Sequence, residues 1–221
     1  MSVGRILPFG IGIMILAGAL PSHASLVTYG DFPTWSSAVG GFTTVTIPDP
    51  GSTGFIYFGA NPASVTYGPL TFSTDGTLGD GNFFNVGPAF TSLPPVLSDQ
   101  NSTFGVQNIL ITFPTAVTAF AFNYGTFNGN DVTFLLSNGD TFTQASTNTV
   151  GTYAVGDFAG ATDTPFTSVL VTSADHVLNV GDVSFVAAAA AAPTATPEPG
   201  TISLLAMAGL GLVAYSRRRR A

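Results

Sequence analysis

The stretch "AVTAFAFNY", Ala116–Tyr124, decides the fold class, because its large side chains alternate with small or polar ones. Phe120, Phe122 and Tyr124 occupy every second position of this run. Successive side chains of a β-strand point to opposite faces, so the three rings share one face of a half-buried strand. We therefore predict that Phe120 and Phe122 lie on the buried face of a central strand.

Similar short runs rich in Thr, Val and Phe lie on both sides of this strand. They are "FTTVTI" (42–47), "ILITF" (109–113), "DVTFLL" (131–136), "DTFTQAS" (140–146), "FTSVLVTS" (166–173) and "DVSFV" (182–186). Asn138-Gly139 separates two of the runs and is a strong hairpin signal. No window between residues 25 and 186 shows a helical stripe. The pattern predicts an all-β domain over 25–186, an antiparallel β-sandwich of jelly-roll type.

The charges are distributed very unevenly along the chain. Its five basic residues are Arg5 and the four arginines of the segment 217–220. Residues 25–196 hold eleven Asp and neither Lys nor Arg, and the single Glu is Glu198. No basic group is available there to neutralise phosphates, which excludes a nucleic acid as partner of this domain.

The first 24 residues read as a signal peptide, which we expect to form a signal helix. Arg5 gives a positive start, Ile6–Leu20 is apolar, and small residues occupy the −3 and −1 positions of a cleavage site between Ala24 and Ser25. A buried N-terminal helix is the alternative. We expect the rest of the chain to be exported. The chain has no Cys, so no disulfide can hold the exported domain together.

The C-terminal segment combines an apolar run with a basic cluster. Thr201–Ser216 is uncharged, and as a helix it would span roughly 24 Å at ~1.5 Å per residue. A block of arginines directly after such a run stays on the cytoplasmic side and stops transfer. These arginines are Arg217, Arg218, Arg219 and Arg220. The segment predicts a transmembrane helix that anchors a precursor in the inner membrane, and a plain single-span anchor without further processing is the alternative.

Residues 187–196, before this segment, are small and rich in Ala, Pro and Thr, as in an exposed linker. Pro197, Glu198 and Pro199 follow, and two prolines favour extended backbone. The ordered tail over 197–221, a Pro-Glu-Pro triplet, an apolar helix and an arginine cluster, closely resembles the PEP-CTERM sorting signal of Gram-negative bacteria. The resemblance implies that an exosortase, a membrane-embedded transpeptidase-like enzyme, cuts the chain at or near the triplet.

The side chains available for catalysis are few, and we expect no enzymatic activity. After removal of the signal peptide the chain retains one His, His176, and no Cys or Lys. A zinc site needs several nitrogen or sulfur ligands, and no nucleophile elbow accompanies His176, which we place in a loop between strands. Two Asp could serve a glycosidase, but none lies in a recognisable motif.

Calcium is the one cofactor that the residues favour, because it takes oxygen ligands alone. Asp75, Asp80 and Asn82 lie within "STDGTLGDGN", Ser73–Asn82, and form the candidate site. Turn chemistry explains the same residues, since Asp and Asn are favoured beside Gly in turns. We expect no cofactor other than this calcium ion.

Two classes of function remain for the exported domain. The first is a structural or interaction protein of the cell surface or extracellular matrix, which the family resemblance links to exopolysaccharide, floc or biofilm formation. The second is a carbohydrate-binding β-sandwich module, with calcium as a conceivable stabiliser. Sugar sites need exposed rings, so the exposure of Trp35, the only Trp, and of the neighbouring Tyr29 and Phe32 separates the two classes.

Overall fold

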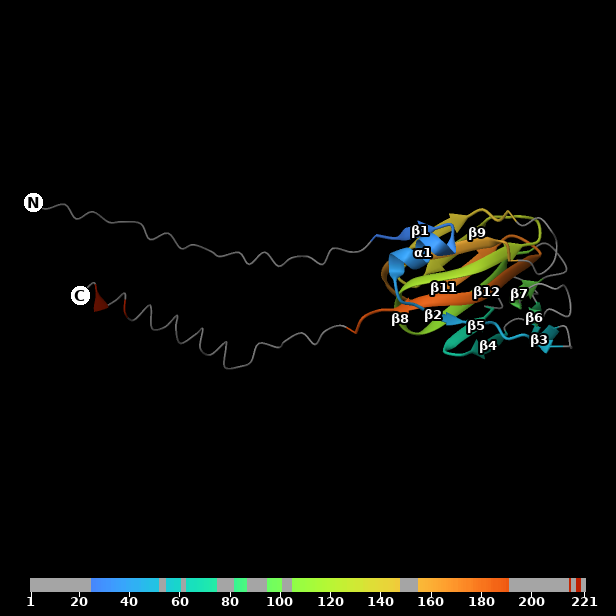
Figure 1. Ribbon diagram of the computed structural model, residues 1–221, viewed down its shortest axis with the longest axis horizontal. Helices are drawn as coiled ribbons and strands as arrows, with labels where there is room; N and C mark the ends of the chain where they lie inside the picture. Colours follow the sequence, from blue (N-terminus) through green and yellow to red (C-terminus); the bar gives the residue numbers. More distant parts are fainter. Residues whose placement is uncertain are drawn as a thin grey trace, which may run out of the picture. The chain divides into compact units, whose positions relative to one another are not determined.

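The computed structural model describes residues 25–51, 55–60, 63–74, 82–86, 95–100, 105–147, 155–190, 215 and 218–219. The chain divides into two compact units, 1–187 and 188–221. The described part of the first unit is mostly antiparallel β-sheet, as the sequence predicts, and it also contains one short helix (Figure 1). The predicted signal peptide and nearly all of the predicted transmembrane segment lie outside the described residues. Within the described part, no helix has the length and apolar character needed to cross a membrane.

The described residues of the first unit form twelve strands and one helix. In chain order they are β1 (Val27–Tyr29), α1 (Phe32–Val39), β2 (Thr43–Val45), β3 (Phe55–Ala60), β4 (Ser64–Tyr67), β5 (Leu70–Ser73), β6 (Asn82–Val86), β7 (Val96–Gln100), β8 (Gln107–Thr126), β9 (Val132–Leu136), β10 (Thr141–Gln144), β11 (Asp157–Ser173) and β12 (Val177–Ala187). All strand pairs are antiparallel.

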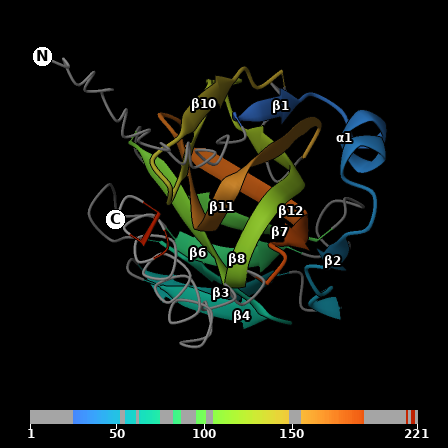
Figure 2. The same cartoon turned by 90° about the vertical axis from the view of Figure 1, so that its left-hand side faces the viewer.

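The long strands β8 and β11 lie side by side and contribute to two layers (Figure 2). The first part of β8 pairs with β5 and with the end of β11. The end of β11 also pairs with β9, and β9 pairs with β10. The later part of β8 pairs with the start of β11 and with β12, from which β7, β6 and β3 continue. The hydrophobic core lies between these two layers.

Pro114 lies inside a strand, which the sequence did not predict. The runs 109–113 and 116–124 were expected to be separate strands, but both belong to β8. The pairing with β11 shifts register here, from Phe166 opposite Val117 to Ser168 opposite Thr112. A proline has no N–H for the ladder and is tolerated where pairing is irregular, so Pro114 marks the point where β8 passes from one layer to the other.

The predicted buried face of β8 is confirmed. Phe120 is fully buried, and Phe122 and Tyr124 are 2% and 1% exposed. Their rings pack across the core on β9, because the ring of Phe134 lies 6.5 Å from Phe120, 5.8 Å from Phe122 and 5.6 Å from Tyr124. Phe142 of β10 stacks on Phe134 at 4.6 Å. Aromatic rings therefore join the two layers.

The helix α1 contradicts the expectation of a domain without helices. Asp31 caps it, since its carboxylate accepts the Thr34 N–H at 2.8 Å, and a proline lies in the first turn. Gly40 ends it with φ 74°. The helix buries Trp35, whose ring lies so close to Gly160 that a Cβ there would be 2.8 Å from Cδ1. Eight residues with one buried side chain give no periodic stripe, so the pattern escaped detection.

The hairpin at Asn138-Gly139 is confirmed. It joins β9 to β10, and Gly139 takes φ 101°, in the left-handed region that favours glycine. The Asn138 side-chain amide donates to Asp163 at 3.0 Å and to the hydroxyl of Thr164 at 2.9 Å. The turn is thereby bonded to the middle of β11.

Candidate functional site

The structure describes few of the sorting and processing residues predicted from the sequence. Ser25, after the predicted signal cleavage, is exposed, and so are Arg218 and Arg219. Asn82 begins β6, without a description of its side chain. The other predicted site residues lie outside the described part: Ala24, Asp75, Asp80, Pro197, Glu198, Pro199, Arg217 and Arg220.

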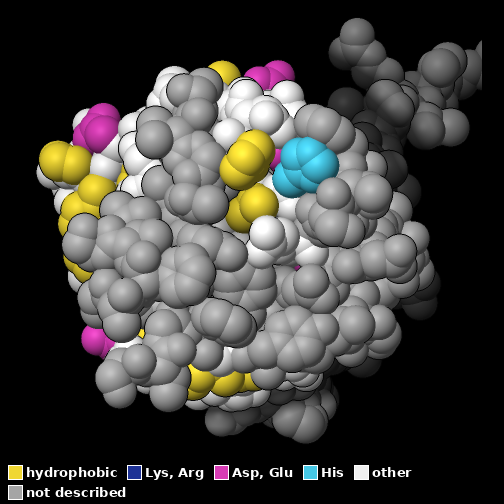
Figure 3. Space-filling model, turned by 90° about the vertical axis from the view of Figure 1, so that its right-hand side faces the viewer, with side chains coloured by type: hydrophobic (Ala, Val, Ile, Leu, Met, Phe, Trp, Pro, Cys, Tyr) yellow, Lys and Arg dark blue, Asp and Glu magenta, His cyan; other side chains and the backbone are white. Residues whose placement is uncertain are grey.

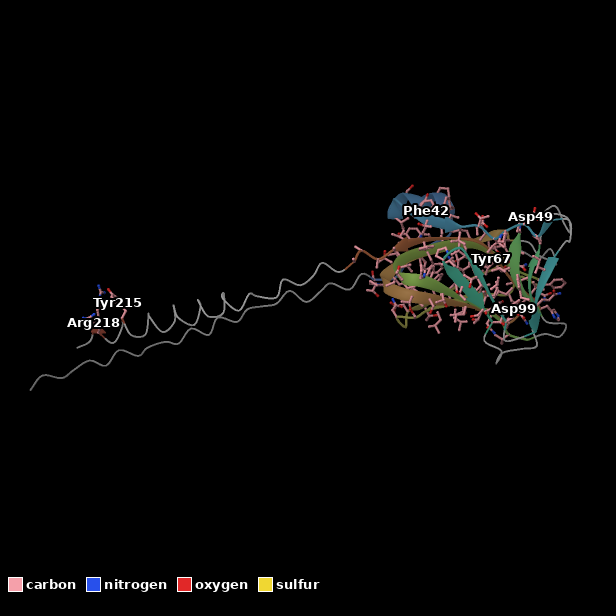
Figure 4. The ribbon with its side chains drawn as sticks, turned by 90° about the horizontal axis from the view of Figure 1, so that it is seen from below. Phe42, Asp49, Tyr67, Asp99, Tyr215 and Arg218 are labelled. Carbon is pink, nitrogen blue, oxygen red and sulfur yellow. The ribbon has the colours of Figure 1, made fainter. Side chains whose placement is uncertain are left out.

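The described part of the second unit contains a helical turn at the basic cluster. The Arg219 N–H donates to the Tyr215 carbonyl at 3.3 Å, and its guanidinium lies 5.4 Å from the Tyr215 ring centroid. Tyr215 and Arg218 extend from this turn in Figure 4. A cation over an aromatic face is attractive, so Arg219 and Tyr215 stabilise the turn locally.

The rings near the start of the domain form a cluster around a buried Trp. Trp35 is fully buried, whereas Phe32 and Phe42 are 42% and 39% exposed. Phe32 lies edge-on to Phe42 at 5.5 Å and to Phe158 at 6.1 Å. Phe42 lies beside α1 in Figure 4. Because Trp35 is inaccessible, this cluster does not offer the exposed Trp platform that would favour sugar binding.

A cavity of about 330 Å³ opens beside Tyr124 and combines polar groups with two aromatic rings. It is lined by Gly30, Tyr124, Gln144, Ala145, Gly156, Asp157 and Phe158. These residues come from the end of β1, the later part of β8, the end of β10 and the start of β11. The pairing of Asp157 with Tyr124 places the carboxylate and the phenol at neighbouring positions of the sheet.

Hydrogen bonds fix the orientation of these polar groups. The Tyr124 hydroxyl donates to the Ala145 carbonyl at 2.9 Å. Asp157 accepts from the Ser146 hydroxyl at 2.7 Å, from the Thr147 N–H at 2.9 Å and from the Thr147 hydroxyl. Burial, followed by the negative charges of Asp157 and Asp131, raises the pKa of Tyr124 well above its ordinary value. Tyr124 is therefore a neutral hydroxyl at physiological pH.

Gln144 lines the cavity, and one of its polar side-chain atoms is buried without a partner. Its Nε2 donates to the Tyr29 carbonyl at 3.3 Å, while the buried Oε1 has no hydrogen-bond partner. Asp157, Tyr124 and the Phe158 ring complete a lining without any cation. Such a set can bind a neutral ligand that donates hydrogen bonds and presents an apolar face. The four segments meet only through long-range pairing, so no local sequence signal could identify this site.

A pair of carboxyl groups lies at the β9–β10 hairpin. A hydrogen bond with Asp163, and then its negative charge, raise the pKa of Asp140. Asp163 is 5% exposed and also accepts the Thr164 N–H at 2.7 Å. Two adjacent carboxylates repel each other, so the pair favours keeping a proton. The sequence missed this pair because the residues are far apart along the chain.

Two further polar side chains, His176 and Asp182, make structural contacts. His176 lies between β11 and β12, as predicted, and its ring is edge-on to the Phe127 ring at 6.0 Å. The described side chains on the face drawn in Figure 3 include no Lys or Arg. Asp182 accepts the Ile47 N–H at 2.8 Å. Within the described ranges, no three His, Cys, Asp or Glu side chains come together as a metal site.

Comparison with solved structures finds distant likeness to carbohydrate-binding modules. A carbohydrate binding module of family 29 is 12% identical over 66% of this chain and 88% of its own, with a TM-score of 0.31. The xylan binding module CBM86 from Roseburia intestinalis is 11% identical over 66% and 95%, with a TM-score of 0.32. A family two carbohydrate esterase from Cellvibrio japonicus is 8% identical over 67% and 34%, also at 0.32. Likeness this weak supports no inference about function.

Comparison with protein families gives a specific result for the tail. No curated protein matches the chain. A family model described as the PEP-CTERM protein-sorting motif matches residues 195–220. This range contains the Pro-Glu-Pro triplet, the apolar segment and the arginine cluster that the sequence singled out. The chain carries a PEP-CTERM protein-sorting motif, as predicted.

Proposed function

We propose that the protein is a structural or interaction protein of the bacterial surface or extracellular matrix, delivered by an exosortase. The sorting motif at residues 195–220 carries the proposal, since it implies a secreted, membrane-anchored precursor that an exosortase processes. The domain supplies one His and neither Cys, Lys nor Arg, which favours a non-enzymatic role. Association with exopolysaccharide, floc or biofilm matrix is the finer part of the proposal.

The chemistry of the tail supports a separate role for each of the three parts of the motif. The prolines of the triplet favour an extended backbone, the conformation in which a processing enzyme can reach a peptide bond. The apolar segment holds the precursor in the inner membrane until it is cut. The arginines keep its end on the cytoplasmic side.

Replacing Pro197, Glu198 and Pro199 with Ala tests this proposal in the producing bacterium. We expect the variant to accumulate as a membrane-bound precursor, while wild type is released from the inner membrane. Pro193→Ala, four residues before the triplet, is the matched control and should be processed normally. Release of the triple variant at the wild-type level would contradict the proposed role of the triplet.

Mass spectrometry of the exported protein tests both ends at once. We expect the mature chain to begin at Ser25 and to end at or near the triplet. Retention of Met1 on the extracellular form would refute the signal peptide, and retention of Arg217–Arg220 would refute processing. The same spectra show any group attached to the new C-terminus.

A carbohydrate-binding role is the second candidate, and the cavity beside Tyr124, lined by Gln144, Asp157 and Phe158, favours it. A neutral sugar offers hydroxyl donors for Gln144 and Asp157 and an apolar face for Phe158. The supporting fold is a β-sandwich that we expect to be of jelly-roll type. Affinity electrophoresis in gels containing neutral polysaccharide of the producing strain should show retardation that Gln144→Leu abolishes and the exposed Thr143→Ala retains. Equal mobility with and without polysaccharide would exclude this candidate.

A further inference from the structure

The layer built around the first part of β8 has an outer face, turned away from the core, that consists of hydroxyl and leucine side chains. In this layer β8 and the end of β11 lie between β5 and β4 on one side and β9 and β10 on the other. Core side chains occupy every second position, such as Ile109 and Ile111 on β8. The side chains between them therefore point outward.

A row of leucines crosses the centre of the outer face. Leu110 of β8 lies opposite Leu170 of β11, which lies opposite Leu135 of β9. The Leu135 side chain is 44% exposed, and the other two are half-buried. The row continues with hydroxyl groups at both ends, since Ser73 of β5 lies opposite Leu110 and Thr141 of β10 opposite Leu135. An exposed apolar stripe with a polar border is typical of a protein–protein contact surface.

Hydroxyl groups fill the rows on both sides of the leucines. The strand registers align Thr66, Thr71, Thr112 and Ser168 on one side, and Thr172, Thr133 and Thr143 on the other. The hydroxyls of Thr66 and Thr71 lie 3.2 Å apart, and those of Thr133 and Thr143 lie 3.1 Å apart. A hydroxyl has one donor and two acceptor positions. Each paired hydroxyl thus keeps hydrogen-bonding capacity toward solvent or a partner.

The outer face is also free of charge. No charged residue occurs in the strand segments of this layer, which are residues 64–67, 70–73, 107–113, 132–136, 141–144 and 166–173. Residues 25–196 nevertheless hold eleven Asp and neither Lys nor Arg. Asp131 and Asp140 directly precede β9 and β10, at the rim of the face. Two copies of this acidic domain repel each other, and an uncharged face is where they can approach most closely.

We propose that the outer face binds the same face of a second copy of the chain. A two-fold dimer brings one surface patch against itself, so that patch has to be self-complementary. Hydroxyl groups meet this condition because they donate and accept, and leucines meet it because they pack against leucines. A patch of like charges does not. Two such sheets would pack about 10 Å apart with nearly aligned strands.

The size of the face makes this contact weak. With strands ~4.8 Å apart and outward side chains ~6.8 Å apart along a strand, the face measures roughly 29 Å by 20 Å, or about 600 Å². A stable complex buries about 800 Å² per partner. Dimers therefore form where copies are concentrated, as on a cell surface or in a matrix. A second copy as partner deepens the proposed structural role, but the contact depends on the domain alone and not on how the tail is processed.

Sedimentation equilibrium of the full chain in density-matched detergent micelles tests the self-association, over protein concentrations from about 1 µM to about 1 mM. We expect monomers at the low end, dimers toward the high end, and tighter association in added NaCl, which screens the repulsion between acidic copies. Leu135→Asp should weaken dimerisation at least about tenfold, because like charges then meet across the contact. Val27→Asp, the same change at a side chain 45% exposed on β1 of the other layer, should dimerise like wild type.

Other outcomes refute the proposal. Wild type that stays monomeric at the highest concentration and salt has no such contact. Equal association of wild type and Leu135→Asp means that the tail or another surface joins the copies. If Leu135→Asp does not fold, as judged by circular dichroism, Thr141→Asp decides by the same criterion, since Thr141 is exposed and lies opposite Leu135. If wild type stays monomeric and Leu135→Asp loses binding to neutral polysaccharide of the producing strain, the face binds a glycan instead.

Discussion

Replacing Phe120 with Ala should strongly destabilise the domain, because this ring is the centre of the contacts between the layers. It is fully buried and lies 5.6 Å from Phe122, 6.5 Å from Phe134, 6.3 Å from Phe142 and 5.8 Å from Phe166, measured between ring centroids. Truncating a buried Phe removes its transfer free energy and leaves a cavity, which costs about 3–5 kcal/mol. For a domain of this size, the melting temperature should fall by roughly 6–20 °C.

Urea unfolding followed by circular dichroism and by Trp35 fluorescence measures this loss as a change in the free energy of unfolding. The matched control is Leu135→Ala on β9, whose side chain is 44% exposed; it should change stability by less than about 0.5 kcal/mol. A loss below about 1 kcal/mol for Phe120→Ala, or equal losses for both variants, would refute a core shared by the two layers.

Three further predictions concern the helix and the hairpin. Gly160→Ala should cost about 1–3 kcal/mol and shift the fluorescence maximum of Trp35, because the new Cβ would lie 2.8 Å from the indole Cδ1; an unchanged spectrum and melt would contradict this. Hydrogen bonds from the first turn of α1 lower the pKa of Asp31 below its ordinary 3.8, so its stabilising effect is present above pH 3.8 and lost as the pH falls through the folded pKa. Asp31→Ala should therefore lower the melting temperature at pH 7 and not below the folded pKa, and an equal effect at both would count against the cap. The pKa of Asp140 is raised, so stability falls as the pH rises from 3.8 through the folded pKa. Asp140→Asn should therefore have a higher melting temperature than wild type at pH 7. A lower melting temperature would show that Asp163 does not repel Asp140.

The sequence could predict features that depend on neighbouring residues alone. The alternation around Phe120 identified the buried face, and Asn138-Gly139 identified a hairpin, because pleat and turn geometry act over a few residues. Pro114 was misleading, since a proline usually ends a strand, and only the register shift against β11 allows it. The helix α1 was not predicted, because eight residues with one buried side chain show too little periodicity, and its cap at Asp31 became evident only in the structure.

The cavity beside Tyr124 could not be predicted for a different reason. Gln144 reaches it from β10 and Asp157 from β11, and the lining exists only after distant strands have paired. The burial of Trp35 likewise depends on Gly160, more than a hundred residues away. Composition, in contrast, predicts without any knowledge of contacts that nucleic acid is not a partner, because residues 25–196 hold neither Lys nor Arg.

Since β8 and β11 belong to both layers, neither layer can open while the other stays intact. Separating the layers breaks the backbone hydrogen bonds of the same two strands that hold each layer together. We therefore expect amide hydrogens on either side of Pro114 to exchange with the same free energy of opening. A domain without disulfides would then resist attack in the extracellular medium through cooperativity, because partial unfolding exposes no stable fragment to a protease.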